Sequence, residues 1–273
     1  VAEDSETCIW RPATGQQIFS YVDTERDNET FVACAAFDDN GRRLVTGDHA
    51  GVVRVWNFSN GACIKNMSKP KDPSHREEVT GVICYEFEDK RFIAGSSWDR
   101  KVTVWFDDSD DSGEVTPYMQ MQGLSDDMLT IAFCYPKSLA TAGTDGSINI
   151  FDIESGYKKH TLQSTKLPGS TPRGRGTVAS DELKNTLYVE KILFLENKNK
   201  VIISAGADGH IRFWEGPWME VLPAGMNSTA QGKLALLVPA GHWPGLGLVD
   251  LAVDEENNIL ISADEAGFVK GWD

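Results

Sequence analysis

Positive charge is scarce in this sequence of 273 residues. It carries 26 Lys and Arg residues against 41 Asp and Glu residues, which gives a formal net charge of −15 at pH 7. A protein that binds a phosphate backbone or an anionic membrane surface needs basic patches, so we expect no nucleic-acid and no membrane partner. Long apolar runs are also missing: none approaches the roughly 20 residues of a membrane-spanning helix, and the first residues do not resemble a signal peptide.

Cysteine and the usual catalytic signatures are scarce as well. The five cysteines are odd in number and widely spaced, which indicates reduced thiols in a cytoplasmic protein. The sequence has no Gly-x-Ser-x-Gly elbow, no phosphate-binding Gly-Lys loop and no paired-cysteine motif. The five histidines are not grouped as a ligand set. We therefore expect no catalytic residues, no metal site and no cofactor.

What the sequence does contain is an internal repeat. Residues 201–215 read as two short strands joined by an Asp-Gly turn, because a β-branched apolar run is followed by an alternating segment. The same shape recurs at 44–57, 92–106, 139–152 and 259–273, and a shortened copy opens the chain. Each copy closes on an aromatic residue, and these residues are Trp10, Trp56, Trp105, Phe151, Trp214 and Trp272.

Two more positions recur relative to each closing aromatic. The turn residue stands six positions before it, and a small or hydroxyl-bearing residue of the second strand stands ten positions before it. The turn position holds Asp4, Ala50, Asp99, Asp145, Asp208 and Ala266, and the second-strand position holds Thr46, Gly95, Thr141, Ser204 and Ser262. Because the Asp-Gly turns fall at one repeat position, we interpret them as structural turns rather than catalytic or phosphate sites.

These residues resemble the WD-repeat (β-transducin-like) family over essentially the whole chain. The resemblance implies an all-β fold, a β-propeller in which each repeat forms one four-stranded blade. It also implies a network in each blade that joins a His, the second-strand Ser or Thr, the turn Asp and the closing Trp. The network is incomplete here, because each set lacks one member: the sets are Ser204, Asp208 and Trp214 without a His; His75, Asp99 and Trp105 without the hydroxyl; and His242, Ser262 and Trp272 without the Asp.

We expect a single propeller segment over residues 1–273. A partial blade at residues 1–22 precedes five blades, at about 31–67, 79–122, 128–162, 188–222 and 248–273. The first blade is partial and the last has no outer strand, so we expect an incomplete ring that belongs to a larger, paired propeller. The alternative is a closed five-bladed ring in which residues 17–22 complete the last blade.

Three segments interrupt the repeat. Residues 107–114 form an acidic hairpin loop, which we interpret as solvated rather than calcium-binding because it lacks the spacing of a calcium loop. The insertion at residues 164–185 is basic, and its Arg173 and Arg175 either contact an acidic partner such as a tubulin surface or lie in an unbound loop.

The third segment, the insertion at residues 216–247, is apolar for a connection. It carries Trp218, Trp243 and a Leu-Ala-Leu-Leu-Val run, and it either binds a partner or folds back on its own blade. We place the outer strand of that blade at residues 219–222. Trp98 is a further contact candidate, because it replaces a small residue beside a turn; the alternative is packing on the neighbouring blade.

Some segments are similar to a narrower family, the large ciliary and flagellar WD-repeat proteins, several of which carry EF-hands ahead of paired propellers. These segments are residues 51–61, 139–146, 188–195 and 254–260. The resemblance implies a non-catalytic protein–protein interaction scaffold of the cytoskeleton, in a ciliary or flagellar axoneme. No EF-hand lies in this sequence, so calcium regulation is not carried over. The alternative is a peptide-binding receptor propeller, such as a substrate-recognition subunit of a ubiquitin ligase or a signalling adaptor; the long insertions favour the scaffold.

Overall fold

The computed structural model describes residues 7–11, 13–21, 31–67, 75, 77–107, 116–122, 124, 126–163, 188–195, 201–216, 232–239 and 246–273. The regular structure in these ranges consists of β-strands and includes no helix. Within the same ranges there is accordingly no helix that could cross a membrane. The chain divides into two compact units, Val1–Met128 and Leu129–Asp273.

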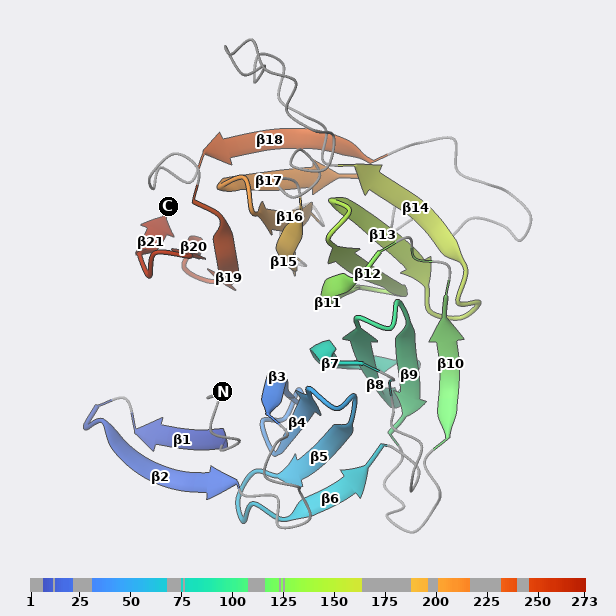
Figure 1. Ribbon diagram of the computed structural model, residues 1–273, viewed down its shortest axis with the longest axis vertical. Coiled ribbons are helices and arrows are strands. Elements are labelled where there is room, and N and C mark those ends of the chain that lie inside the picture. Colours follow the sequence, from blue (N-terminus) through green and yellow to red (C-terminus); the bar gives the residue numbers. More distant parts are fainter. Residues whose placement is uncertain are drawn as a thin grey trace. The chain divides into compact units, whose positions relative to one another are not determined.

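The first unit holds one two-stranded sheet and two four-stranded antiparallel sheets (Figure 1). The two-stranded sheet pairs β1 (Thr7–Arg11) with β2 (Gln16–Tyr21). The next sheet consists of β3 (Val32–Phe37), β4 (Arg43–Asp48), β5 (Val53–Asn57) and β6 (Cys63–Asn66). The third consists of β7 (Val79–Phe87), β8 (Lys90–Ser97), β9 (Val102–Phe106) and β10 (Pro117–Met121).

The second unit holds two four-stranded sheets and one sheet with three described strands. The first consists of β11 (Met128–Cys134, which begins at the unit boundary), β12 (Ser138–Gly143), β13 (Ser147–Asp152) and β14 (Lys158–Gln163). The second consists of β15 (Val189–Leu195), β16 (Val201–Gly206), β17 (His210–Glu215) and β18 (Lys233–Pro239). The third consists of β19 (Leu248–Asp254), β20 (Ile259–Asp264) and β21 (Val269–Trp272).

In every sheet each strand pairs with the next strand along the chain, which is the meander of a propeller blade. The predicted all-β propeller fold, with five blades after a partial one, is confirmed. The five later closing aromatics all lie on third strands, and four of them are at most 4% exposed: Trp56, Trp105, Phe151 and Trp214. The first closing aromatic, Trp10, is 54% exposed, because it lies on the two-stranded sheet and not inside a full blade.

The outer strand of the β15–β18 blade differs from the sequence expectation. The structure places it at β18, whose Lys233 pairs with Glu215 and whose Pro239 pairs with His210. The expected segment, residues 219–222, lies outside the described residues. The apolar run that we assigned to an insertion is thus a strand, and Val238 packs against the buried cluster of this blade. The sequence prediction took the first apolar segment after Trp214 as the outer strand. In the structure a later segment, β18, pairs with β17 instead, because strand pairing depends on the neighbouring strand as well as on local sequence.

Asp107 also departs from expectation, since we placed it in a solvated acidic loop. Its side chain is 2% exposed and forms ion pairs with Arg43 Nη1 at 2.7 Å and Lys65 Nζ at 3.3 Å. Arg43 also pairs with Asp38 at 3.1 Å. Burial alone would lower the pKa of Arg43, but the carboxylates of Asp107 and Asp38 hold it above its usual range. Asp107 therefore joins its own blade to the β3–β6 blade.

The turn between β4 and β5 contains a glycine whose backbone conformation no other residue can adopt without strain. Gly51 has φ of 84°, and a Cβ atom there would lie 2.2 Å from the carbonyl oxygen of His75. His75 also donates its backbone N–H to the Gly51 carbonyl at 2.8 Å. Gly267, at the same repeat position of the last blade, has φ of 83° but no atom within 4 Å of such a Cβ.

We expect Gly51→Ala to destabilise the protein by several kcal/mol more than Gly267→Ala. Both variants place an L-residue at positive φ, which costs about 1–2 kcal/mol. Only in Gly51→Ala does the new methyl group also clash with the backbone of His75. Chemical denaturation of the two variants measures the difference. Equal losses would show that the close contact with His75 does not constrain the turn.

A second prediction concerns acid stability and Asp152, which follows the closing aromatic Phe151. Its carboxylate accepts hydrogen bonds from the Ser155 N–H (2.9 Å) and hydroxyl (3.0 Å) and lies 2.5 Å from Lys159 Nζ. Burial alone would raise the pKa of Asp152, but Lys159 and Ser155 hold it below its usual value.

Because this pKa is lower in the folded state than the roughly 3.9 of an unfolded Asp, the ionised group stabilises the fold above about pH 4. That contribution is lost as the pH falls through the folded pKa. We expect Asp152→Asn to lower the melting temperature at pH 7 and to flatten its fall between about pH 5 and pH 3. Thermal melting across this range is the measurement, and an unchanged slope would contradict the assignment.

Candidate interaction site on the turn between β8 and β9

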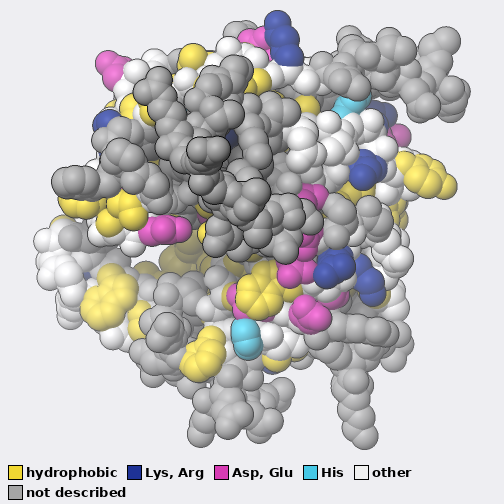
Figure 2. Space-filling view, turned by 45° about the horizontal axis from the view of Figure 1, so that its top comes forward, with side chains coloured by type: hydrophobic (Ala, Val, Ile, Leu, Met, Phe, Trp, Pro, Cys, Tyr) yellow, Lys and Arg dark blue, Asp and Glu magenta, His cyan; other side chains and the backbone are white. Residues whose placement is uncertain are grey.

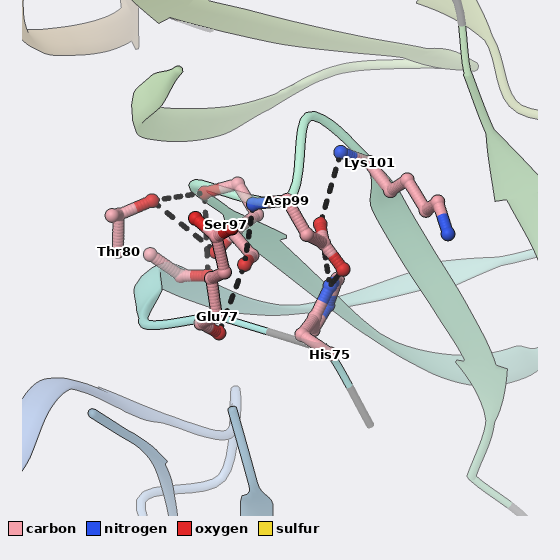
Figure 3. Close-up of polar contacts among 8 residues, drawn as sticks. His75, Glu77, Thr80, Ser97, Asp99 and Lys101 are labelled. Atoms are coloured by element: carbon pink, nitrogen blue, oxygen red, sulfur yellow. Dashed lines mark hydrogen bonds and ion pairs between the residues drawn. The ribbon is translucent and has the colours of Figure 1, made fainter. Parts of the chain in front are cut away.

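The turn between β8 and β9 is held by hydrogen bonds from several directions (Figure 3). The Asp99 N–H donates to Ser97 Oγ at 3.1 Å, and the Lys101 N–H donates to Asp99 Oδ1 at 3.1 Å. The Ser97 hydroxyl donates to the carbonyl of Glu77 at 3.0 Å. The ring of His75, which is 2% exposed, lies with Nδ1 3.1 Å from Asp99 Oδ2. The turn is therefore fixed both internally and from the segment that precedes β7.

Arg100 occupies a position of this turn that other repeats fill with glycine. Its φ is 63°, in the region that costs an L-residue about 1–2 kcal/mol. The Arg100 N–H donates to the Ser97 carbonyl at 3.2 Å, and its Nε lies 3.2 Å from Asp127 Oδ1. Strained backbone of this kind persists only where its surroundings fix it, and it occurs often at binding sites.

Trp98 is the side chain that this fixed turn exposes. Its backbone N–H donates to the Glu78 carbonyl at 3.1 Å, and 37% of the residue is accessible. The ring of His49, from the β4–β5 turn, meets it edge to face with centroids 6.4 Å apart. His49 Nδ1 lies 2.5 Å from Glu78 Oε2. We name Trp98, His49, Glu77 and Glu78 the Trp98 patch.

The two sequence alternatives for Trp98 are both represented in this geometry. The indole contacts His49 of the neighbouring blade edge to face, yet 37% of the Trp98 residue remains accessible. On the face drawn in Figure 2, hydrophobic side chains reach the surface in small, separate groups. A rigid aromatic side chain among polar neighbours is typical of the centre of a protein–protein contact.

The hydrogen bond between the closing Trp and the second-strand hydroxyl is present in three blades. Indole nitrogens donate at 2.8–2.9 Å in the pairs Trp56–Thr46, Trp214–Ser204 and Trp272–Ser262. In the blade that carries the Trp98 patch, Gly95 replaces the hydroxyl-bearing residue. Three buried polar atoms there have no hydrogen-bond partner among the described residues: His75 Nε2, Trp105 Nε1 and Thr103 Oγ1.

We expect Gly95→Ser to be more stable than Gly95→Ala by about 1–2 kcal/mol, since a hydroxyl can satisfy buried donors that a methyl group cannot. A Cβ atom at Gly95 would lie 3.2 Å from His75 Nε2, so both variants require the same small shift of the His75 ring. Comparing the two cancels this shift and the change in unfolded-state entropy. Thermal and chemical denaturation give the difference, and no advantage for serine would refute the missing-hydroxyl interpretation.

Two turn carboxylates, those of Asp208 and Asp145, act differently from the expected network. Asp208 was expected to join Ser204 and Trp214, but its carboxylate pairs with Arg212, with Nη1 3.0 Å from Oδ1. It also accepts the His210 N–H at 3.2 Å. Asp145 likewise accepts the N–H and the hydroxyl of Ser147, at 2.8 and 2.7 Å. These carboxylates stabilise the turns directly.

Sequence reasoning missed two further turn carboxylates. Asp48, 1% exposed, accepts the Val52 N–H at 2.8 Å and pairs with Arg54 at 2.7 Å. Asp264 accepts the N–H groups of Ala266 and Phe268, at 3.0 and 2.9 Å. The signal was available: the two blades with Ala at the turn position carry an Asp two residues earlier.

Several predicted residues lie outside the described part of the chain. They are Asp4, Arg173, Arg175, Trp218, His242 and Trp243. Among the residues that are described, no group of three or more His, Cys, Asp or Glu side chains could hold a metal ion.

The chain is similar to a family of repeats and to several known proteins. The family described as "WD domain, G-beta repeat" matches residues 19–57. The "WD repeat-containing protein on Y chromosome" of Drosophila virilis is 29% identical over 98% of this chain and 25% of its own length. Its counterpart in Drosophila grimshawi is 24% identical with the same coverage. The "Ribosome biogenesis protein ytm1" of Aspergillus niger is 27% identical over 67% of this chain and 40% of its own. The chain thus spans about a quarter of the length of these fly relatives.

Proposed function

We propose that this chain, a β-propeller segment of the WD-repeat family, is a non-catalytic scaffold for protein–protein interaction in a large assembly. The observation that carries the proposal is the Trp98 patch, an exposed aromatic side chain on a turn held by His75, Glu77 and Glu78. A contact residue that is already ordered loses little conformational entropy when a partner binds. Specific binding by such a fold depends on residues that depart from its repeat, and Trp98 is one of them.

We further propose that the assembly is the axoneme of a cilium or flagellum, with axonemal proteins or tubulin as partners. The support is the similarity of residues 51–61, 139–146, 188–195 and 254–260 to ciliary and flagellar WD-repeat proteins. A chain that spans a quarter of its fly relatives also fits one segment of a large scaffold.

Ribosome biogenesis is the second candidate. It is favoured by the name of the Aspergillus niger relative, which covers 67% of this chain. Both candidates place the propeller in a large assembly, so they differ in the assembly and not in the type of function. A peptide receptor for ubiquitin transfer or signalling differs from both, because it would bind its partner transiently.

Localisation of the tagged full-length protein separates these assemblies. We expect it to remain with detergent-extracted axonemes and not to sediment with pre-ribosomal particles. In the same cells, Trp98→Ala should reduce axonemal retention several-fold, while Tyr157→Ala, which removes a 78% exposed aromatic on another turn, should leave it unchanged.

Thermal melting of both variants serves as the folding control. Sedimentation with pre-ribosomal particles would replace the axonemal proposal with the second candidate. A protein that is soluble and monomeric in both extracts would refute the scaffold.

A further inference from the structure

We propose that the Trp98 patch receives a Lys or Arg side chain from a basic segment of a protein partner. The inference rests on the proposed scaffold function and adds the chemistry of the partner. It follows from three features, which are a fixed indole, two glutamates in the segment that holds its turn and the net negative charge of the chain.

The indole of Trp98 provides an accessible aromatic surface in a fixed position. Its backbone hydrogen bond to Glu78 and its edge-to-face contact with His49 restrict it, while 37% of the residue stays accessible. Among aromatic rings, indole attracts cations most strongly, and the attraction acts on a cation within about 6 Å of the ring centre, over its face. A partner side chain would not have to order the ring first.

Two glutamates precede β7 and hold the turn that carries Trp98 through their backbone carbonyls. Glu77 and Glu78 are consecutive. The backbone carbonyl of Glu77 accepts the Ser97 hydroxyl, and that of Glu78 accepts the Trp98 N–H. Glu77 is exposed, and the Glu78 side chain is 20% accessible beside His49. The whole chain has a formal net charge of −15, so an approaching cationic segment is attracted at long range as well.

Two described cations, Arg100 and Lys101, follow Trp98 on the turn. Arg100 extends to Asp127, with Nε 3.2 Å from Oδ1, and so has a carboxylate partner of its own. In Figure 3 the side chain of Lys101 points away from Asp99 and His75. The two glutamates and the net negative charge of the chain therefore favour a cationic side chain of the partner as the occupant.

An apolar partner is the alternative occupant. Phe31 accepts the His49 N–H at its carbonyl (2.9 Å) and is itself 41% exposed, so an apolar contact is available near the patch. The two occupants differ in what they require of position 98. A cation requires an aromatic face, whereas an apolar side chain requires only apolar surface.

The test measures binding of the full chain to three fluorescein-labelled Gly-Ser peptides by fluorescence anisotropy. The first peptide carries alternating Arg and Lys residues. In the second, citrulline replaces Arg and glutamine replaces Lys, so the charge is lost. In the third, norleucine replaces both, so only apolar surface remains. We expect only the first peptide to bind the wild-type chain.

Variants of the patch then assign the contact. Trp98→Leu should raise the Kd for the basic peptide about 5–30-fold, which corresponds to about 1–2 kcal/mol, while Trp98→Phe should raise it less. Glu77→Gln combined with Glu78→Gln should also weaken binding. The charge control is Glu86→Gln, on the opposite end of β7, and the aromatic control is Tyr157→Leu; neither should change the Kd by more than about twofold.

Several outcomes would overturn the proposal. These are a Trp98→Leu variant that binds as tightly as wild type, a norleucine peptide that binds as well as the basic one, and an effect of Glu86→Gln equal to that of the patch glutamates. Absence of measurable binding of the basic peptide to the wild-type chain would overturn it too. None of these outcomes would contradict the proposed scaffold function, because that function is tested separately by retention in the axoneme.

Discussion

One interaction recurs in all five blades that follow the two-stranded sheet: an Asp carboxylate accepts a backbone N–H in the turn between the second and third strands. The acceptors are Asp48, Asp99, Asp145, Asp208 and Asp264. Such a carboxylate accepts hydrogen bonds from backbone N–H groups of the turn that have no partner in the pairing of the strands. It also works from either of two positions, which is why the blades with Ala50 and Ala266 retain the turn.

Fixing the turn through one carboxylate leaves its other residues free to vary. The residue before the turn Asp is Trp98 in one blade and a small or apolar residue in others, such as Thr144 and Ala207. A hydrogen-bonded turn therefore supports side chains that differ from blade to blade, and these side chains carry specificity. The same constraint explains why Arg100 tolerates positive φ, since the carboxylate of Asp99 and the Ser97 carbonyl hold the chain on both sides of it.

Sequence periodicity was sufficient to predict the fold because the repeat is local. Strand pairing between neighbours and the closing aromatics depend on residues less than one repeat apart. Periodicity was insufficient to locate β18, which pairs with β17 across a long connection. It was also insufficient for the burial of Asp107, which depends on Arg43 in another blade. Trp98 was recognised from its departure from the repeat. Its neighbours His49 and Glu78 were not, because they come from other positions and only the packing of blades brings them to it.

The blade that carries Trp98 also departs from the repeat at several other positions. It has Gly95 where a hydroxyl is expected, Arg100 where glycine is expected, and buried polar atoms on His75 and Trp105 without a partner in the described residues. Each departure costs free energy. Local rules that fit elsewhere in a chain tend to be broken where function requires it. The concentration of these costs beside an exposed Trp98 is therefore independent support for placing a contact there, because packing of the indole alone would require none of them.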